Sequence, residues 1–206
     1  GHPVFVSEDT SIYRDHFSGG DGSPKSPWSI STIEQLKFLA TKPALYGDSF
    51  VLHNDLDLAE YDGSTAALEW PMIGHQNLPF SGQLDGGGHT ISNLTIERTG
   101  ETAVGFISNL LGAHLKNLNL HRVRVSSDGS NVGALAGFVL ASYVDTVHVE
   151  GRLENPVDVE STSTTAQNVG GVLGIVHLSA INQVTTDLDV KSVGTLNLGG
   201  LIGFTY

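Results

Sequence analysis

The glycine-rich phrase VGALAGFV, at residues 132–139, decides the fold of this chain because it is repeated. Related phrases, VGFISNLL, VGGVLGIV and LGGLIGFT, begin at Val104, Val169 and Leu198. Successive copies start 28, 37 and 29 residues apart. A period of this length is typical of proteins built from similar units that stack on one another. The sequence therefore predicts a repeat stack.

A second phrase follows the glycine phrase at a nearly fixed distance, as LKNLNL, VDTVHV and INQVTT, and an earlier copy reads ISNLTI. In each copy, a gap of three between apolar positions suits a corner of the chain, and the following gap of two suits a strand. We predict that equivalent residues lie above one another in columns. The columns are Ile91, Leu115, Val144 and Ile181; Leu94, Leu118, Val147 and Val184; and, as a polar ladder, Asn93, Asn117, Thr146 and Gln183.

These columns predict an all-β fold in which each coil, meaning one repeat of the chain, carries three short strands that pair in parallel with the next coil. The glycine phrase supplies one of them. An antiparallel sandwich would not require the same class of residue at the same offset in successive units. The extra residues of the longest repeat, Glu154 to Asn168, are polar and predict a loop that projects from one coil.

One convincing helix precedes the repeats. Ser31 and Glu34 have the spacing of a capping box, which places the helix start at Ser31. Pro43 ends the pattern after about three turns. The apolar positions recur at helical spacing, at Ile33, Leu36, Leu39 and Ala40. We expect this helix to cover one end of the stack, because a repeat array needs caps.

The segment from Phe50 to Leu58 alternates between apolar and polar residues, which predicts a strand and the first rung of the stack. We therefore divide the chain into an N-terminal segment with the capping helix, residues 1–49, and a repeat array, residues 50–206. The array ends inside a repeat, so we expect the natural protein to continue and its further coils to stack on this end.

The composition excludes several classes of function. Aspartate and glutamate number 22 against 10 lysine and arginine residues, giving a formal net charge of −12. Nucleic acids and anionic membranes attract basic surfaces, so neither is an expected partner. The chain has no cysteine, which excludes disulfides and cysteine-based zinc sites. Its longest apolar run, Val132 to Ala141, is about half a membrane span, so we expect no membrane insertion.

From about Gly20 to Tyr206, the chain resembles repeat modules that carry the GLUG motif. The resemblance rests on PWSISTIEQLKFLA, FVLHNDLDL, WPMIG and PFSGQLDGGGHTISNLTI, and on the later VGALAGFV and VGGVLGIV. Such modules occur in bacterial adhesins, in proteins similar to filamentous haemagglutinin, and in non-catalytic regions of immunoglobulin A1 metalloproteases. This chain departs from the pattern at Ser108, where the second glycine is expected, so we expect a looser coil there.

The resemblance implies a right-handed parallel β-helix with a scaffold or adhesion role, outside the cell or at the bacterial cell surface. The chain contains no His-Glu-x-x-His sequence, so the peptidase activity of some relatives does not transfer to it.

Two acidic residues are the best candidates for catalysis. Asp55 and Asp57 lie two positions apart on one strand face, and paired carboxylates can cleave glycosidic bonds. Outward-facing aspartates also solvate a strand and discourage edge pairing, and we prefer that interpretation. With Glu60, Asp62 and Gly63 the same residues offer oxygen ligands for calcium, although their spacing matches no calcium-binding loop.

The remaining polar residues suggest structure rather than chemistry. Histidines such as His75, His89 and His148 are scattered without metal-ligand spacing, so we expect no metal site. Asp85 precedes three glycines, Gly86–Gly88, and is expected to organise a turn through its side chain. We assign no catalytic residue and no cofactor, and we leave the binding residues open.

Two functions remain compatible with the sequence. The first is a non-catalytic β-helical module of an exported bacterial surface protein, acting in adhesion or as a spacer, with a cell-surface protein or glycan as partner. The second is a carbohydrate-active β-helix, either a lyase or a hydrolase. Only 7% of the residues are aromatic, and Trp28 and Trp70 both lie near the N-terminal cap. This favours the first function, because sugar-binding grooves use stacked rings.

Overall fold

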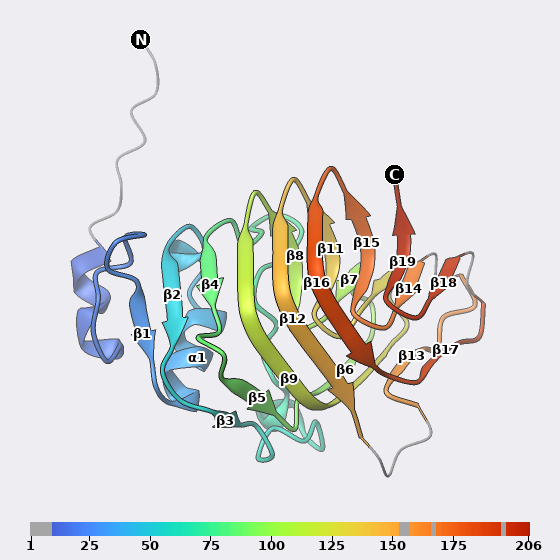
Figure 1. The fold of residues 1–206 in the computed structure, drawn as a ribbon. Helices are drawn as coiled ribbons and strands as arrows, with labels where there is room; N and C mark the ends of the chain where they lie inside the picture. Colours follow the sequence, from blue (N-terminus) through green and yellow to red (C-terminus); the bar gives the residue numbers. More distant parts are fainter. Residues whose placement is uncertain (1–9, 153–156, 166–167, 195–196) are drawn as a thin grey trace.

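The computed structural model describes residues 10–152, 157–165, 168–194 and 197–206. The chain is mostly β-strand, and every ladder between its named strands is parallel (Figure 1). The predicted all-β character and the parallel pairing are thereby confirmed. Figure 1 shows the strands stacked along one direction, with the helical segment at one end and β16–β19 at the other.

The helical segment lies at the N-terminal end. The helix α1 (Ile33–Ala40) buries Leu36, Leu39 and Ala40, as its spacing predicted. It starts one residue later than predicted, because Thr32 rather than Ser31 is the N-cap and its capping box is completed by Gln35 rather than Glu34. Its eight residues also make it shorter than three turns. The flanking 3₁₀ helices are η1 (Thr10–His16), η2 (Pro43–Leu45) and, further along the chain, η3 (Ala66–Leu68).

The first strand of the stack lies earlier in the chain than the strand predicted at Phe50–Leu58. Strand β1 (Trp28–Ile30) pairs with β2 (Ser49–Leu52), so the sheet begins before residue 50. The predicted strand from Phe50 to Leu58 is two strands, β2 and β3 (Leu56–Asp57), separated by exposed polar residues. The division into residues 1–49 and 50–206 stays a prediction.

The largest sheet has eleven strands, with the central order β1-β2-β4-β9-β12-β16. The strands β3, β5, β6, β13 and β17 join it off this path. Besides β1, β2 and β3, the strands of this sheet are β4 (Gln83–Asp85), β5 (Thr90–Ser92), β6 (Thr95–Arg98), β9 (His114–Ser127), β12 (Tyr143–Gly151), β13 (Val159–Ser161), β16 (Ala180–Asp187) and β17 (Val190–Ser192).

The glycine phrases form two further sheets, because each phrase supplies two short strands and not the single strand predicted. The first sheet, in chain order, contains β7 (Ala103–Val104), β10 (Asn131–Val132), β14 (Asn168–Gly170) and β18 (Asn197–Gly199). The second contains β8 (Ile107–Leu111), β11 (Ala136–Leu140), β15 (Leu173–His177) and β19 (Ile202–Thr205). The chain therefore visits the three sheets in the same order in each complete repeat, and the last repeat supplies only β18 and β19.

The register of the later coils agrees with the predicted columns. Val144 pairs with Leu115 on one side and Ile181 on the other. Val147 likewise pairs with Leu118 and Val184. The predicted corner lies between these columns, since Asn117, Thr146 and Gln183 all have φ near +50°.

The column predicted for the earliest copy, ISNLTI, is wrong. Ile91 pairs with Leu120, and it is Leu84 that pairs with Leu115. Leu94 therefore does not lie over Leu118, and Asn93 does not share the column of Asn117. Asn93 corresponds instead to Arg122, since both residues have positive φ, +58° and +57°. The phrase thus belongs to a second corner of the coil, which has the same apolar spacing as the first.

Glycine is required where the two glycine-phrase sheets meet. A Cβ on Gly174 would lie 2.5 Å from the carbonyl oxygen of Gly137 and 2.8 Å from the backbone nitrogen of Val132. A Cβ on Gly203 would lie 2.7 Å from the backbone nitrogen of Val169. Each of these glycines therefore packs against a first-sheet strand of the preceding coil, backbone to backbone.

Ser108 occupies the column of Gly137, yet the looser coil expected there is not observed. Ser108 is 2% exposed, and its hydroxyl donates a hydrogen bond to the carbonyl oxygen of Ala103. Strand β7 is the end strand of its sheet, so no earlier strand of that sheet lies where a side chain at position 108 would clash. A side chain is therefore accepted in this coil.

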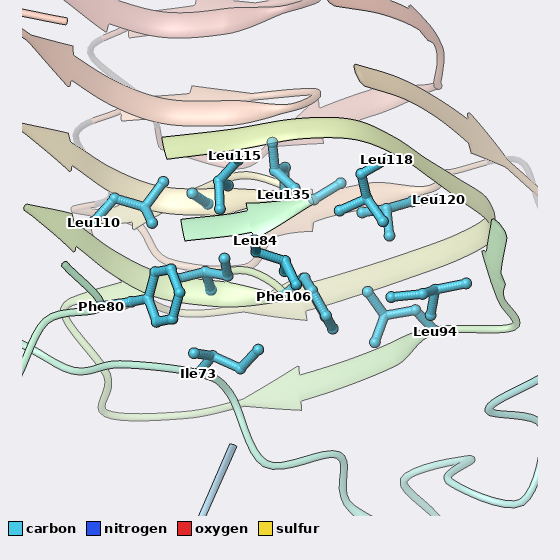
Figure 2. Packing of buried hydrophobic residues seen from close by; sticks show 14 of the residues in the cluster. Ile73, Phe80, Leu84, Leu94, Phe106, Leu110, Leu115, Leu118, Leu120 and Leu135 are labelled. Carbon is cyan, nitrogen blue, oxygen red and sulfur yellow. The ribbon is translucent and has the colours of Figure 1, made fainter. Parts of the chain in front are cut away.

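A continuous apolar core fills the interior of the stack (Figure 2). The core contains side chains from all three sheets, among them Val104, Leu110 and Leu118. Figure 2 shows Leu110 and Leu118 together with Phe106, which lies in the bend between β7 and β8. Their columns of like residues bury each side chain against those of the neighbouring coils, which is the main source of stability in a stack of this kind.

Candidate functional site

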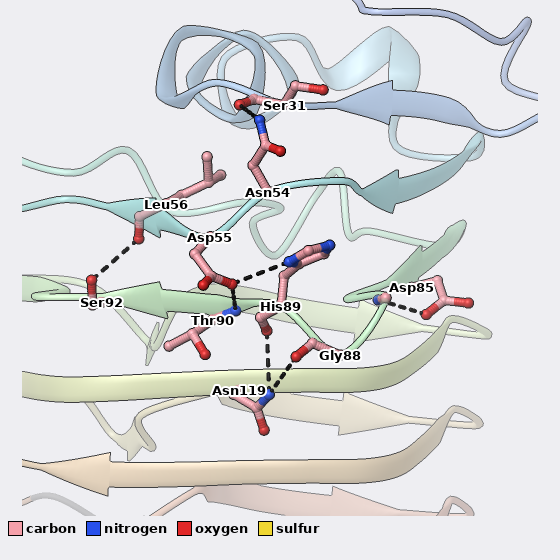
Figure 3. A network of polar contacts seen from close by, with 11 residues as sticks. Ser31, Asn54, Asp55, Leu56, Asp85, Gly88, His89, Thr90, Ser92 and Asn119 are labelled. Atoms are coloured by element: carbon pink, nitrogen blue, oxygen red, sulfur yellow. Dashed lines mark hydrogen bonds and ion pairs between the residues drawn. The ribbon is translucent and has the colours of Figure 1, made fainter.

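Asp55, the first residue of the predicted acidic pair, connects two coils. It lies between β2 and β3, and its Oδ1 accepts the N–H of Thr90 at 2.9 Å (Figure 3). The same oxygen is 3.1 Å from Nδ1 of His89. The Thr90 N–H, followed by the His89 contact, lowers the pKa of the Asp55 carboxyl below its ordinary value. The carboxylate is thus engaged by the next coil.

Asp57 has a similar role one step along the chain. Its Oδ1 accepts hydrogen bonds from Nδ2 of Asn93 at 2.7 Å and from the N–H of Ala59 at 3.0 Å. The carboxylates of Asp55 and Asp57 therefore both accept hydrogen bonds from this chain, and their donors are different residues. This arrangement joins the strand ends of adjacent coils.

The candidate calcium ligands are not brought together. Asp62 accepts the N–H of Ser64 at 2.9 Å, a local turn contact separate from those of Asp55 and Asp57. Within the described residues, no group of three or more histidine, aspartate or glutamate side chains is placed to hold a metal ion. The sequence left calcium binding between Asp55 and Asp62 open, and the expected absence of a metal site stays a prediction.

Asp85 organises the glycine turn, as predicted. The N–H of Gly87 donates to its Oδ1 at 2.9 Å, and Nδ2 of Asn117 donates to the same oxygen at 3.0 Å. Nζ of Lys116 lies 3.0 Å from Oδ2. Burial acts to raise the pKa of Asp85, but the hydrogen bonds and the Lys116 charge outweigh it, and the pKa is lowered. The turn is therefore fixed to the next coil.

The three histidines lie apart in the structure. His89 contacts Asp55, whereas His148 lies with its Nδ1 2.9 Å from the hydroxyl of Thr185 on the next coil. His75 lies in a tight turn in which its backbone pairs with that of Leu78. These positions offer no shared ligand set.

The segment from Glu154 to Asn168 is not one projecting loop. Val159–Ser161 forms β13 between β9 and β17, and Asn168 begins β14. Asp158 is buried, and its carboxylate accepts the N–H groups of Arg152 at 2.7 Å and Asp189 at 2.9 Å. The rest of the prediction concerns residues 153–156 and 166–167, which lie outside the described residues.

A cavity that was not predicted from the sequence is lined by residues of both glycine-phrase sheets and by Gln76 and Pro79. It measures about 250 Å³, and its lining includes Phe138, Leu140, Asn109, Asn131 and Gln76. A sequence signal for it exists. Phe138 and Leu140 flank the fully buried Val139, so strand alternation directs both outward. The predicted columns followed the second phrase and did not extend to these positions.

Comparison with known proteins gives relatives of part of the chain. No protein-family profile matches the chain. Halomucin from Haloquadratum walsbyi is 31% identical over 172 residues, which cover 79% of this chain and 2% of halomucin. A candidate Gly-rich membrane protein from Evansella cellulosilytica is 30% identical over 138 residues, covering 65% of this chain and 16% of that protein. The chain thus spans a small part of the curated relatives that it matches.

One solved structure has a similar fold. It is a candidate immunoglobulin A1 protease from Bacteroides ovatus, which superposes with a TM-score of 0.54 over 93% of this chain and 65% of that one. The sequence identity is 17%, so the likeness concerns the fold. Among the described helices of the present chain, none has the length and apolar character needed to cross a bilayer.

Proposed function

We propose that this chain is a non-catalytic module of an exported bacterial surface protein, located at the cell surface or outside the cell, and that it acts in adhesion or as a spacer. The observation that carries the proposal is the use of the acidic residues. Hydrogen bonds that join coils or close turns are accepted by Asp55 and Asp57, which the sequence offered for chemistry, and by Asp85. Relatives that include a candidate membrane protein support the surface location.

The proposed architecture is a right-handed parallel β-helix of the GLUG type, capped by α1. Three parallel sheets visited in the same order by every complete repeat support winding of the chain around one core. Connections between parallel strands are right-handed in nearly all proteins, which supports the hand. The likeness to the Bacteroides ovatus structure supports the fold.

Further coils of the parent chain are proposed to cover the far end. Ile181 and Val184 are half-buried in β16, the end strand of the large sheet, whereas Val144 and Val147, their equivalents in β12, are at most 1% exposed. A further coil would bury the last pair in the same way.

Labelling of intact cells tests the surface assignment. Cells that make the parent protein are treated with a membrane-impermeant biotin reagent, and the protein is detected with an antibody against this module. We expect the module to be labelled along with known surface proteins, while a cytoplasmic enzyme stays unlabelled. Labelling that requires cell lysis would refute the assignment.

A turnover assay tests the absence of catalysis. The purified chain is incubated with uronic-acid polysaccharides and with neutral polysaccharides, and new reducing ends and unsaturated products are followed. We expect no product above the level of heat-treated protein. Product formation that is lost in Asp55→Asn or Asp57→Asn would establish the carbohydrate-active alternative.

A further inference from the structure

The outer face of the sheet β8-β11-β15-β19 carries two columns that are mainly apolar. The backbone register places Phe138 beside Asn109 and Ile175, and Ile175 beside Phe204. The neighbouring column consists of Leu111, Leu140, His177 and Tyr206. Tyr206 and Phe204 are 64% and 38% exposed, and the Tyr206 ring stacks on His177 with 3.9 Å between ring centres.

The outer face of β9-β12-β16 is different in kind. Lys116, Asp145 and Asn182 form one of its columns, and Asn182 donates a hydrogen bond to Asp145 at 2.7 Å. Polar columns of this type are ordinary protein surface, whereas a contiguous apolar and aromatic strip on one face marks a binding surface.

The apolar strip ends in the cavity of about 250 Å³, which adds polar groups to it. Three amide side chains, Gln76, Asn109 and Asn131, lie in its wall, and no ionisable side chain does. Asn131 belongs to a ladder in which Asn168 donates to it at 2.7 Å and Asn197 donates to Asn168 at 2.9 Å. Each amide group has two N–H donors, so Asn131 retains one beyond its bond to Thr102.

We propose that this strip and its cavity bind an extended, uncharged glycan with β-1,4 linkages. The inference rests on the proposed adhesion function and names its ligand class. Amides pair with hydroxyl groups, and the carbon-bound hydrogens of a pyranose ring pack on aromatic and aliphatic faces. A wall without ionisable groups matches a ligand without charge.

The spacing of the rings specifies an extended chain. Phe138 and Phe204 occupy the same column with Ile175 between them, so they lie two strand spacings apart, about 9.6 Å. An extended β-1,4-linked chain presents the same sugar face at every second residue, at a closely similar repeat. A coiled α-linked chain has no such straight repeat.

Calorimetric titration of the whole chain tests the proposal, with cellohexaose, fully N-acetylated chitohexaose and mannohexaose as ligands and maltohexaose as the α-linked control. We expect saturable binding of at least one β-1,4-linked hexasaccharide and weaker or no binding of maltohexaose. Phe138→Ala and Phe204→Ala should each weaken binding roughly tenfold, the loss expected for one stacking ring.

Two controls separate ligand binding from folding. Tyr143→Ala removes an aromatic ring, 61% exposed, from the polar face and should leave the affinity unchanged. Phe138→Leu keeps apolar volume but lacks the ring, and thermal melting checks the fold of each variant.

Absence of saturable binding by all three β-1,4-linked hexasaccharides at millimolar concentration would overturn the inference. Equal losses in the Phe138 and Tyr143 variants would also overturn it. If surface labelling succeeds and titration fails, only this inference is wrong. If titration succeeds while intact cells stay unlabelled, the surface assignment is the one that fails.

Discussion

The two ends of the stack are filled in different ways. Near the N-terminus the interior is occupied by large rings, with Trp28, Phe50, Trp70 and Phe80 at most 1% exposed. Phe17 joins them, its ring centre 5.0 Å from that of Trp28. In the later coils the inward residues are mostly valine, leucine and alanine, and glycines bring two sheets into backbone contact.

This difference explains where the repeat is visible in the sequence. A large aromatic ring can fill the interior even where successive coils differ in backbone path, so the N-terminal coils need no shared sequence motif. Backbone contact leaves no room for adjustment, and the later coils must repeat the same small residues at the same positions. The sequence repeats most regularly in the coils whose backbones pack most closely.

The largest effect is expected for a side chain at a backbone contact. Gly174→Ala places a Cβ 2.5 Å from the carbonyl oxygen of Gly137, and neither backbone can yield easily. We expect a loss of more than about 3 kcal/mol in the free energy of unfolding, measured by urea denaturation. Gly200→Ala is the matched control, since its Cβ would meet nothing within 4 Å, and it should be neutral. Equal effects at the two glycines would contradict the backbone-contact explanation.

Removal of a ring should have an effect of similar size. Phe50 is 1% exposed and lies between the rings of Phe17 and Phe80. Phe50→Ala should cost about 3–5 kcal/mol and Phe50→Leu distinctly less, because leucine fills part of the cavity. The urea midpoints of both variants measure this. A loss below about 1 kcal/mol for Phe50→Ala would show that the N-terminal rings do not hold that end.

The same substitution in two coils compares a strand that has a neighbour on each side with the end strand of the sheet. Val147 is 1% exposed, whereas Val184, its partner in the end strand β16, is half-buried. Val147→Ala should cost about 2 kcal/mol and Val184→Ala about half of that, in proportion to the apolar area removed from water. The ratio of the two losses should approach one in a longer chain that covers β16.

A strained corner in the regular coils offers a stabilising change. Leu178 is 74% exposed and has φ of +47°, a conformation that costs a branched side chain about 1–2 kcal/mol. Glycine relieves that strain but adds freedom to the unfolded chain, so Leu178→Gly should stabilise by about 0.5–1 kcal/mol. A higher melting temperature is expected. A clear decrease would indicate that the leucine side chain makes contacts that outweigh its strain.

The smallest effect concerns a carboxyl at the N-terminal end. Burial raises the pKa of Asp48 above its ordinary value, while Nε1 of Trp28 donates a hydrogen bond to its Oδ2 at 2.8 Å. A raised pKa in the folded state favours folding at low pH, and this contribution is lost as pH rises through the folded-state pKa. Asp48→Asn keeps an acceptor for Trp28, so its stability relative to the wild type should rise between about pH 3 and pH 7. A pH-independent difference between the two urea midpoints would contradict the burial of a charged Asp48.

The sequence predicted what depends on repeated apolar spacing and missed what depends on backbone conformation. The columns through Val144 and Val147 followed from spacing alone. The misplacement of Ile91 has a specific cause. Two corners of the coil share the same apolar spacing, and the arginine at position 122 gives no sign that it adopts the positive φ of Asn93.

Two other features were hidden by composition. Strand β13 is short and lies in a polar segment, so Val159–Ser161 resembled a loop until its neighbours β9 and β17 were known. The apolar strip gave no signal of its own, because both tryptophans lie near the N-terminal cap and the phenylalanines of the repeats are far apart in the sequence. Phe138 and Phe204 become a pair only through the register of three strands, β11, β15 and β19.

The direction of the backbone hydrogen bonds has a mechanical consequence. They point from coil to coil, along the axis of the stack, so tension applied between its two ends would load one ladder at a time instead of all of them together. Each coil contributes only about 4.8 Å to the length of the folded stack, yet it would release about 100 Å when its residues were fully extended. A protein carrying this module under load would lengthen in steps, giving way from the less covered end while the ring-filled end held.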